Sequence, residues 1–143
     1  MPDGSVFARV HVLVLCDEIE ELPGAEELFD LGSVRAQLRV PSFPYVHPQL
    51  CAYLQVTGHE GIASGHMVVV NEATDEEILY RPIEEFRLSG PLEVIPIWLR
   101  MRDCEFPEPG VYWFQVFLND KLVMERRFRV VASLGDSNGQ PIR

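Results

Sequence analysis

The amino-acid sequence predicts an all-β fold: an antiparallel β-sandwich of about eight strands, immunoglobulin-like or C2-like in character, with at most one short helix. The clearest observation is a pair of alternating runs, 111–118 and 122–131, which a short polar segment joins. Further alternating runs recur along the chain at roughly 8–12-residue spacing. Turn-forming residues lie between them. This combination is typical of sandwiches and barrels.

The last two runs are predicted to form a β-hairpin. Successive side chains of a strand point to opposite faces, so every second residue shares a face. The polar residues Asn119-Asp120-Lys121 between the runs are typical of a hairpin connection. The expected inner faces are Tyr112, Phe114, Val116 and Leu118 on the first strand and Leu122, Met124, Phe128 and Val130 on the second.

The remaining strands follow from the same alternation. Residues 82–90 are irregular and moderately polar, and we expect them to cross between the two sheets. Pro96 interrupts an apolar run, which indicates an edge strand or a bulge. One or two helical turns are expected at 25–29, just after Pro23. The other expected strands are 6–15, 33–40, 49–57, 63–71, 77–81 and 92–102.

Length and composition favour a single domain, residues 1–131, followed by a flexible tail, 132–143. With 143 residues and a hydrophobic fraction of 47%, the chain can bury a core of its own. A net charge of −10 argues against nucleic acid as a partner, because such binding depends on neutralised phosphates. No run of about 18 apolar residues exists, so membrane insertion is not expected.

The three cysteines, Cys16, Cys51 and Cys104, are widely spaced and include no C-x-x-C pair. Neither a disulfide framework nor a zinc knuckle fits this pattern. We therefore expect three small buried side chains in a reducing cytoplasm. The apolar run 10–15 lacks a basic leader, which also argues against a secretion signal.

Catalytic motifs are absent from the sequence, which has no G-x-S-x-G elbow and no glycine-rich phosphate loop. His59 and His66 are two plausible metal ligands with Glu60 or Glu72 nearby, but a zinc site needs three or four fixed ligands. The sequence therefore predicts a protein that is not an enzyme and that holds no cofactor or metal.

The segment 17–30 is strongly acidic and contains no lysine or arginine. We expect a solvated loop around the Pro23-Gly24 turn. Its carboxylates lack the regular spacing of a calcium loop. Docking of a basic partner is the main alternative, and a bound cation is left open.

Three groups of residues together resemble a family of small bacterial proteins known only as a domain of unknown function. The resemblance covers about 10–131 and implies a β-sandwich, but no activity and no ligand. The residues that carry it are Leu15-Cys16-Asp17, then Phe43, Pro44, His47, Pro48 and Leu50, and finally Pro107, Pro109, Gly110 and Tyr112.

Aromatic residues at outward positions form a candidate interaction face. Trp98 and Trp113 occupy the face opposite the apolar face of their strands, where a soluble sandwich normally carries polar residues. An exposed apolar patch usually marks an interface. The candidate face comprises Val94, Trp98, Trp113 and Phe117 with the arginines Arg127 and Arg129; Arg126, Arg100 and Arg102 could extend its basic stripe.

The expected function is that of a non-enzymatic protein-interaction or assembly module, which binds a protein partner or a second copy of itself. The alternative is a sandwich that binds a small ligand or carbohydrate, with Trp98, Trp113 and Tyr112 as stacking platforms.

Overall fold

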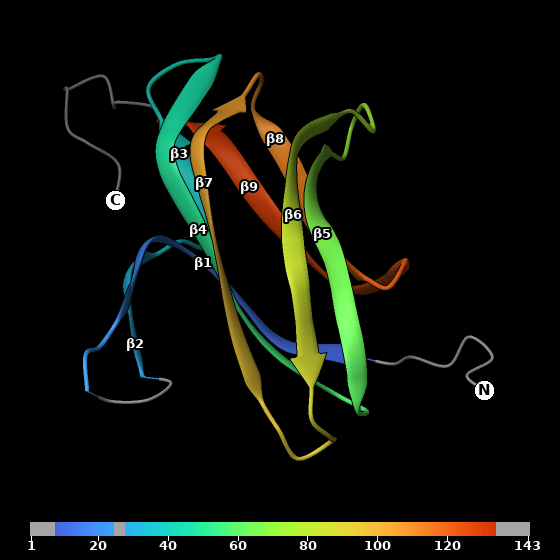
Figure 1. Cartoon of the computed structure of the whole chain (residues 1–143). Coiled ribbons are helices and arrows are strands. Elements are labelled where there is room, and N and C mark those ends of the chain that lie inside the picture. Colours follow the sequence, from blue (N-terminus) through green and yellow to red (C-terminus); the bar gives the residue numbers. More distant parts are fainter. Residues whose placement is uncertain (1–7, 25–27, 134–143) are drawn as a thin grey trace.

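The structure is a computed structural model that describes residues 8–24 and 28–133. Within these ranges the chain forms nine strands and no helix (Figure 1). The strands are β1 (Ala8–Glu21), β2 (Phe29–Val34), β3 (Gln37–Val40), β4 (Tyr45–Gly58), β5 (Gly61–Asn71), β6 (Glu77–Leu88), β7 (Ile95–Phe106), β8 (Gly110–Leu118) and β9 (Lys121–Ala132).

The strands form two curled sheets that enclose one core (Figure 1). The first sheet has the order β2-β1-β4-β7, and the second has the order β3-β9-β8-β5-β6. All neighbouring strands pair antiparallel except β3 and β9, which run parallel. The all-β prediction is confirmed, whereas a purely antiparallel arrangement is wrong for this one pair.

Alternation along β4 and β8 contributes large fully buried side chains to the core. Leu50, Leu54 and Val56 of β4 are fully buried in the cluster that also contains Tyr112 and Phe114 of β8. A buried aromatic side chain removes a large apolar area from water, which is the dominant favourable contribution to folding. The expected inner face of the first hairpin strand, Tyr112 to Leu118, is therefore confirmed.

The expected strand 33–40 is in fact two strands in different sheets. β2 ends at Val34 in the first sheet, and β3 begins at Gln37 in the second sheet. The backbone N–H of Arg35 donates to the carbonyl of Leu15 between them, 2.7 Å away. Alternation continues across this crossing, so the sequence pattern could not reveal it.

Two other expectations differ from the structure. Residues 82–88 belong to β6, so an irregular crossing at 82–90 is wrong; β6 lies at a sheet edge, where proline is tolerated. Much of the acidic segment is strand, because β1 continues to Glu21 and β2 begins at Phe29. The helix expected at 25–29 is therefore wrong at its last residue, and 25–27 lie outside the described residues, as do 134–143 of the expected tail.

The hairpin between β8 and β9 has a two-residue turn. Asn119 and Asp120 both have positive φ, 48° and 67°, as the tight turns that match strand twist require. The register shifts by one residue between Val116 and Phe117, so Phe117 pairs with Leu122. Leu122 is consequently 46% exposed, and its expected place on the inner face is wrong.

A polar cluster holds β1, the β2–β3 link and β4 together. The carboxylate of Asp17 accepts two hydrogen bonds from Nε of Arg35, at 3.0 and 3.1 Å, and one from its Nη2 at 2.5 Å. Nε2 of the buried His47 lies 2.9 Å from the same carboxylate, and Nδ1 of His47 lies 3.0 Å from the hydroxyl of Tyr45. Burial by itself would raise the pKa of Asp17, but the bonds from Arg35 and His47 outweigh it and hold the pKa below 3.8.

A buried tyrosine holds the corner between β7 and β8. The hydroxyl of Tyr112 donates to the carbonyl of Glu108, four residues earlier, at 2.6 Å. Its ring contacts Phe106 edge to face, with 5.0 Å between the ring centres. The side chain therefore links the turn that enters β8 to the core.

We expect Asp17→Asn to lower the free energy of unfolding by about 1–3 kcal/mol near neutral pH, because Arg35 and His47 lose a charged acceptor. The pKa of Asp17 is depressed in the folded state, so its stabilisation is complete above pH 3.8 and decreases as pH falls below that value. Urea unfolding at a series of pH values should show the wild type and the variant converging below about pH 4.

A matched control for this experiment is Glu60→Gln, which changes an exposed carboxylate that has no ion pair among the described residues. It should leave the unfolding curves unchanged. A constant difference between wild type and Asp17→Asn across the acidic range would contradict the role given to the carboxylate.

We expect Tyr112→Phe to destabilise the fold by about 0.5–1.5 kcal/mol, because the hydrogen bond from the tyrosine hydroxyl to the carbonyl of Glu108 is lost. Tyr80→Phe removes an equivalent hydroxyl from a side chain that is 57% exposed, and it should change stability by less than about 0.5 kcal/mol. Chemical unfolding of the two variants makes the comparison. Equal stabilities would show that the corner bond contributes nothing.

Candidate functional site

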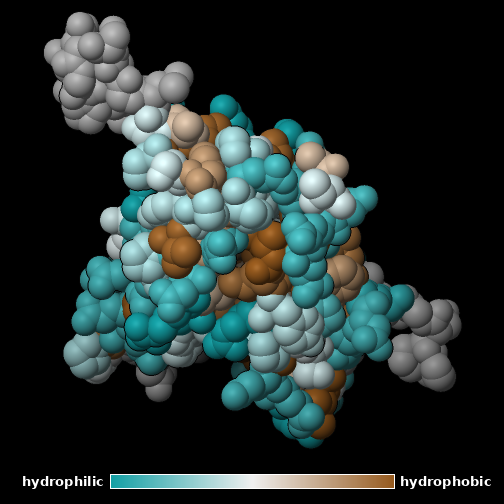
Figure 2. All heavy atoms as spheres, turned by 90° about the horizontal axis from the view of Figure 1, so that it is seen from above, coloured by the Kyte–Doolittle hydropathy of each residue, from teal (hydrophilic) through white to brown (hydrophobic). Residues whose placement is uncertain are grey.

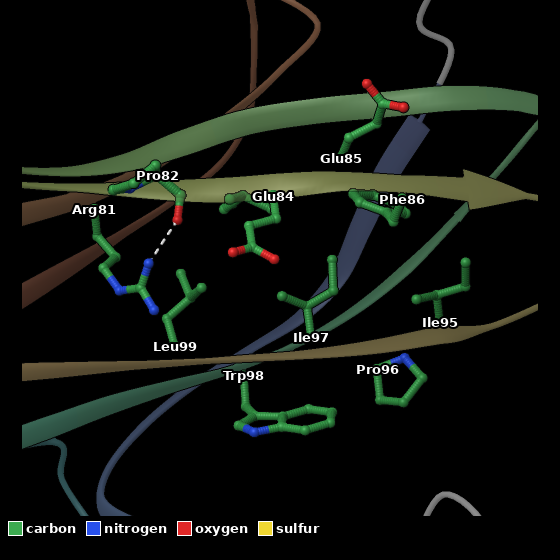
Figure 3. Close-up of a pocket in the computed structure, with 11 residues that line it drawn as sticks. Arg81, Pro82, Glu84, Glu85, Phe86, Ile95, Pro96, Ile97, Trp98 and Leu99 are labelled. Carbon is green, nitrogen blue, oxygen red and sulfur yellow. Dashed lines mark hydrogen bonds between the residues drawn. The ribbon is translucent and has the colours of Figure 1, made fainter.

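A cavity of about 370 Å³ lies between the edge strands β6 and β7 (Figure 3). We call this space the seam. It is lined by Arg81 to Phe86 from β6 and Ile95 to Leu99 from β7. Since each of these strands has a paired neighbour on one side only, the seam lies between two edges that no described backbone hydrogen bond connects. Its volume is in the range of ligand pockets.

Prolines help to explain why the two edges do not pair. Pro82 lies in β6 and Pro96 lies in β7, and a proline has no N–H to donate to a ladder. Proline residues on edge strands also hinder pairing with other chains. The expectation that Pro96 marks an edge strand is confirmed by the position of β7.

The two walls of the seam differ: the β7 side is aliphatic, and the β6 side carries the charged residues Arg81 and Glu84. Ile95, Ile97 and Leu99 point from β7 towards β6 (Figure 3). Glu84 points from β6 towards β7, whereas Glu85 points to the other side of β6 (Figure 3). An aliphatic surface beside a carboxylate can accommodate an amphipathic group with a positive charge.

Arg81 closes one end of the seam. Its Nε donates to the carbonyl of Arg100 on β7 at 3.2 Å, and its Nη1 donates to the carbonyl of Pro82 at 2.9 Å. The guanidinium thus donates its hydrogen bonds to backbone carbonyls and not to the carboxylate of Glu84. Glu84 forms no ion pair within the described parts of the chain.

A second notable surface crosses the outer face of the second sheet. Four side chains from adjacent strands form what we call the outer row: Tyr80, His66, Phe117 and Leu122. The ring of His66 stacks against Tyr80 and Phe117, with centres 5.0 and 4.9 Å away. Gly65 permits this approach of β8, because a Cβ there would lie 1.8 Å from the carbonyl oxygen of Phe117.

Trp113 lies on the same outer face but already has internal partners. Its Nε1 donates to the carboxylate of Glu72 at 2.7 Å. The guanidinium of Arg127 lies 5.7 Å from the centre of the indole ring, and its Nε is 3.6 Å from Glu72. These contacts form a closed group of tryptophan, arginine and glutamate.

The structure separates the sequence-predicted face into different surfaces. Trp113, Phe117, Arg127 and Arg129 are brought together on β8 and β9. Trp98 lies on β7 in the first sheet, where its ring centre is 4.9 Å from that of Phe29, and Val94 is in the link before β7. A single face that contains both tryptophans is therefore wrong.

The predicted basic stripe is divided as well. Arg100 and Arg102 lie on β7, in the other sheet from Arg127 and Arg129. Arg126 pairs with the buried Phe114, and its Nε is buried without a hydrogen-bond partner among the described residues. Arginines that lie close in the sequence consequently contribute to different surfaces.

The stacking platform proposed for a carbohydrate is not formed. Tyr112 is fully buried in the core, and Trp98 and Trp113 lie in different sheets. Seen from above, the end of the molecule shows hydrophobic residues in separate areas among hydrophilic ones (Figure 2). That end therefore offers no broad apolar surface either.

The metal-ligating side chains and the cysteines of the described residues were predicted to be structural. No group of three or more histidine, cysteine or acidic residues among them could hold a metal ion. Cys16, Cys51 and Cys104 are free and buried, as expected, and burial raises the pKa of Cys16 to about 11 and that of Cys104 to about 12. A thiol that stays protonated is a poor nucleophile.

The Asp17 cluster is also saturated by its own contacts. Both nitrogens of the His47 ring and both oxygens of the Asp17 carboxylate have partners. This arrangement leaves no free general base, so its geometry is that of a structural contact. The sequence offered Asp17 and His47 as family landmarks but gave no signal that they are in contact.

The acidic segment lines a cavity of its own. Glu18, Ile19 and Glu20 of β1 and Asp30 and Gly32 of β2 surround a space of about 350 Å³. The three carboxylates make this groove negative. They are not placed close enough together to hold a metal ion, in keeping with the result for the described residues as a whole.

No helix in the described part of the chain is long and apolar enough to cross a membrane.

One solved structure shares this fold at low sequence identity: the alkylpurine DNA glycosylase of Pseudomonas fluorescens bound to DNA containing an abasic site analog, with a TM-score of 0.55 and 10% identity. The match covers 87% of this chain and 30% of the glycosylase chain. β-Glucosidases from Erythrobacter marinus and Listeria innocua match with TM-scores of 0.45 and 0.47, at 16% and 12% identity.

The β-glucosidase matches cover 68% and 84% of this chain and only 14% and 16% of the enzymes. This chain therefore spans a minor part of each of these structures, and the likeness concerns the fold alone. No curated protein matches the sequence.

A family model matches residues 11–131, which include the strands, the seam and the outer row. The chain belongs to a family of unknown function, DUF6941, as the resemblance of its sequence landmarks indicated.

Proposed function

We propose that the protein is a non-enzymatic interaction module whose contact surface is the outer face of the second sheet. The observation that carries this proposal is the outer row, which places Tyr80, His66, Phe117 and Leu122 side by side across four strands. Tyr80 is 57% exposed and Leu122 is 46% exposed. Outer faces of sheets are normally polar, and exposed apolar patches mark interfaces.

The outer row supports this role better than the tryptophan does. Trp113 is occupied by Glu72 and Arg127, so its N–H and its ring face already have partners. Tyr80 and Leu122, at the two ends of the row, have no such polar contacts among the described residues. The row therefore provides the centre of the contact surface, with the Trp113 group at its border.

The partner that fits this surface has an apolar centre and acidic groups beside it. Arg129 is exposed on the same face and forms no ion pair within the described residues. A second copy of this chain offers the same apolar row as the centre of a contact. Self-association is thus the first form of the interaction to test.

We also propose that the fold is an immunoglobulin-like sandwich. β1, β4 and β7 follow the order of strands A, B and E, and β9, β8 and β5 follow the order of G, F and C. Tyr112, near the start of β8, donates to a backbone carbonyl four residues earlier, as the tyrosine corner of such folds does. A cytoplasmic location is part of the proposal and is supported by the three free cysteines.

We expect the wild-type protein to self-associate and Leu122→Arg to weaken the association at least tenfold, because it places a charge in the apolar row. Size-exclusion chromatography with light scattering over a range of concentrations measures this. Trp113→Arg should have a smaller effect, since Trp113 lies at the border.

Leu92→Arg is the matched control, because Leu92 is 96% exposed and lies between β6 and β7, away from the row. It should associate like the wild type. The proposal would be contradicted by two observations together: the wild type is a monomer at every concentration, and Leu122→Arg leaves the set of co-purifying proteins unchanged.

A further inference from the structure

The seam is separate from the outer row and suited to another kind of ligand. The row lies on the outward face of the second sheet, whereas the seam lies between the edges of the two sheets. β6 and β7 each carry backbone groups on one side that no neighbouring strand in the described chain satisfies. An extended peptide is the ligand class that satisfies such groups, because it adds its own backbone to the edge.

The dimensions of the seam match a short segment. The part of β6 that lines it runs from Arg81 to Phe86, which corresponds to roughly 17 Å of strand. A peptide of about five residues spans this length. Arg81 limits the site at one end, since its guanidinium already occupies the carbonyls of Arg100 and Pro82.

The prolines define where the added backbone can pair. Pro82 and Pro96 cannot donate hydrogen bonds, so neither edge offers a continuous ladder. On β6 no proline lies between Ile83 and Leu88, so the N–H groups of this stretch that point away from β5 can pair with an added strand. We therefore place the peptide against this stretch, with alternate side chains directed at Ile95 and Ile97 (Figure 3).

Glu84 supplies a charge preference. Its carboxylate points into the seam beside aliphatic side chains, and it has no ion pair within the described parts of the chain (Figure 3). Arg81, the nearby cation, is directed to backbone carbonyls instead. A lysine or arginine of the ligand would complement Glu84.

We propose that the seam binds an extended peptide segment of a partner protein that has alternating apolar residues and one lysine or arginine beside Glu84. The peptide backbone adds to the edge of β6, its apolar side chains cover Ile95 and Ile97, and its cation pairs with Glu84. This site does not depend on the outer row, and either can be correct without the other.

The test uses two synthetic, blocked heptapeptides of alternating valine and threonine, with either a lysine or a glutamate at the centre. Titration into the isotope-labelled full chain, followed by amide chemical shifts, gives both the affinity and the place of binding. The lysine peptide should shift amides of 83–88 and 95–99 and bind about fivefold more tightly than the glutamate peptide.

Substitutions then separate the contributions. Glu84→Gln should abolish the preference for lysine, whereas Glu60→Gln, which removes an exposed carboxylate outside the seam, should retain it. Ile97→Lys should weaken both peptides at least tenfold. Because Ile97 is only partly buried, the chemical-shift spectrum of this variant will show whether the fold is intact.

Three results would overturn the proposal. One is no shift in the seam with the lysine peptide up to about 1 mM, the weak limit of specific binding. Another is equal affinity for the two peptides. The last is a lysine preference that persists in Glu84→Gln, which would assign the effect to the overall negative charge of the protein.

Discussion

The arrangement of the two sheets depends on the contacts of Asp17. At this residue β1 separates from β4, and the β2–β3 link passes beside it. The carboxylate binds Arg35 of the link and His47 of β4, and the backbone carbonyl accepts a hydrogen bond from Gln49. Because β2 and β3 belong to different sheets, this attachment determines where the chain crosses and places β3 beside β9. Removal of a single charge would therefore loosen three segments together.

The outer faces of the two sheets differ in how far neighbouring side chains cover or bind their aromatic residues. On the first sheet Phe29 of β2 lies against Tyr53 and Trp98, with ring centres 5.4 and 4.9 Å away, so the hairpin of β1 and β2 covers part of this face and leaves Trp98 36% exposed. On the second sheet the Trp113 group is closed by Glu72 and Arg127, whereas the ends of the outer row stay exposed. An aromatic residue therefore indicates a contact surface only where neighbouring side chains leave it exposed and without a partner in the same molecule. Side-chain type alone does not identify the site, and this is why the row is a better candidate than either tryptophan.

Alternation in the sequence predicted where most strands lie along the chain, but not which strands pair with one another. The inner face of β8 and the edge position of Pro96 follow from local patterns, because period two and the missing proline N–H are local properties. The one-residue register shift before Phe117 places Leu122 on the outer face, and the sequence pattern of β9 does not indicate this shift. The contact between Asp17 and His47 joins residues 30 positions apart, and the separation of Trp98 from Trp113 depends on which sheet holds each strand. Such properties are set by tertiary pairing, so a single sequence carries no direct signal for them.

The outer row and the seam were missed for the same reason: both bring together residues from strands whose order was unknown.

β6 connects the two candidate surfaces physically. Tyr80 belongs to the outer row, and the next residue, Arg81, lines the seam, because successive side chains of a strand face opposite sides. As an edge strand, β6 is hydrogen-bonded as a strand only to β5, so it has fewer constraints than β8 or β4. A ligand that pairs with its free edge would hold β6 more firmly and thereby restrict Tyr80 as well. Leu122, at the far end of the row, lies on β9 and is separated from β6 by β5 and β8. Any influence of the seam on the row must therefore act through Tyr80 and His66 rather than through Leu122.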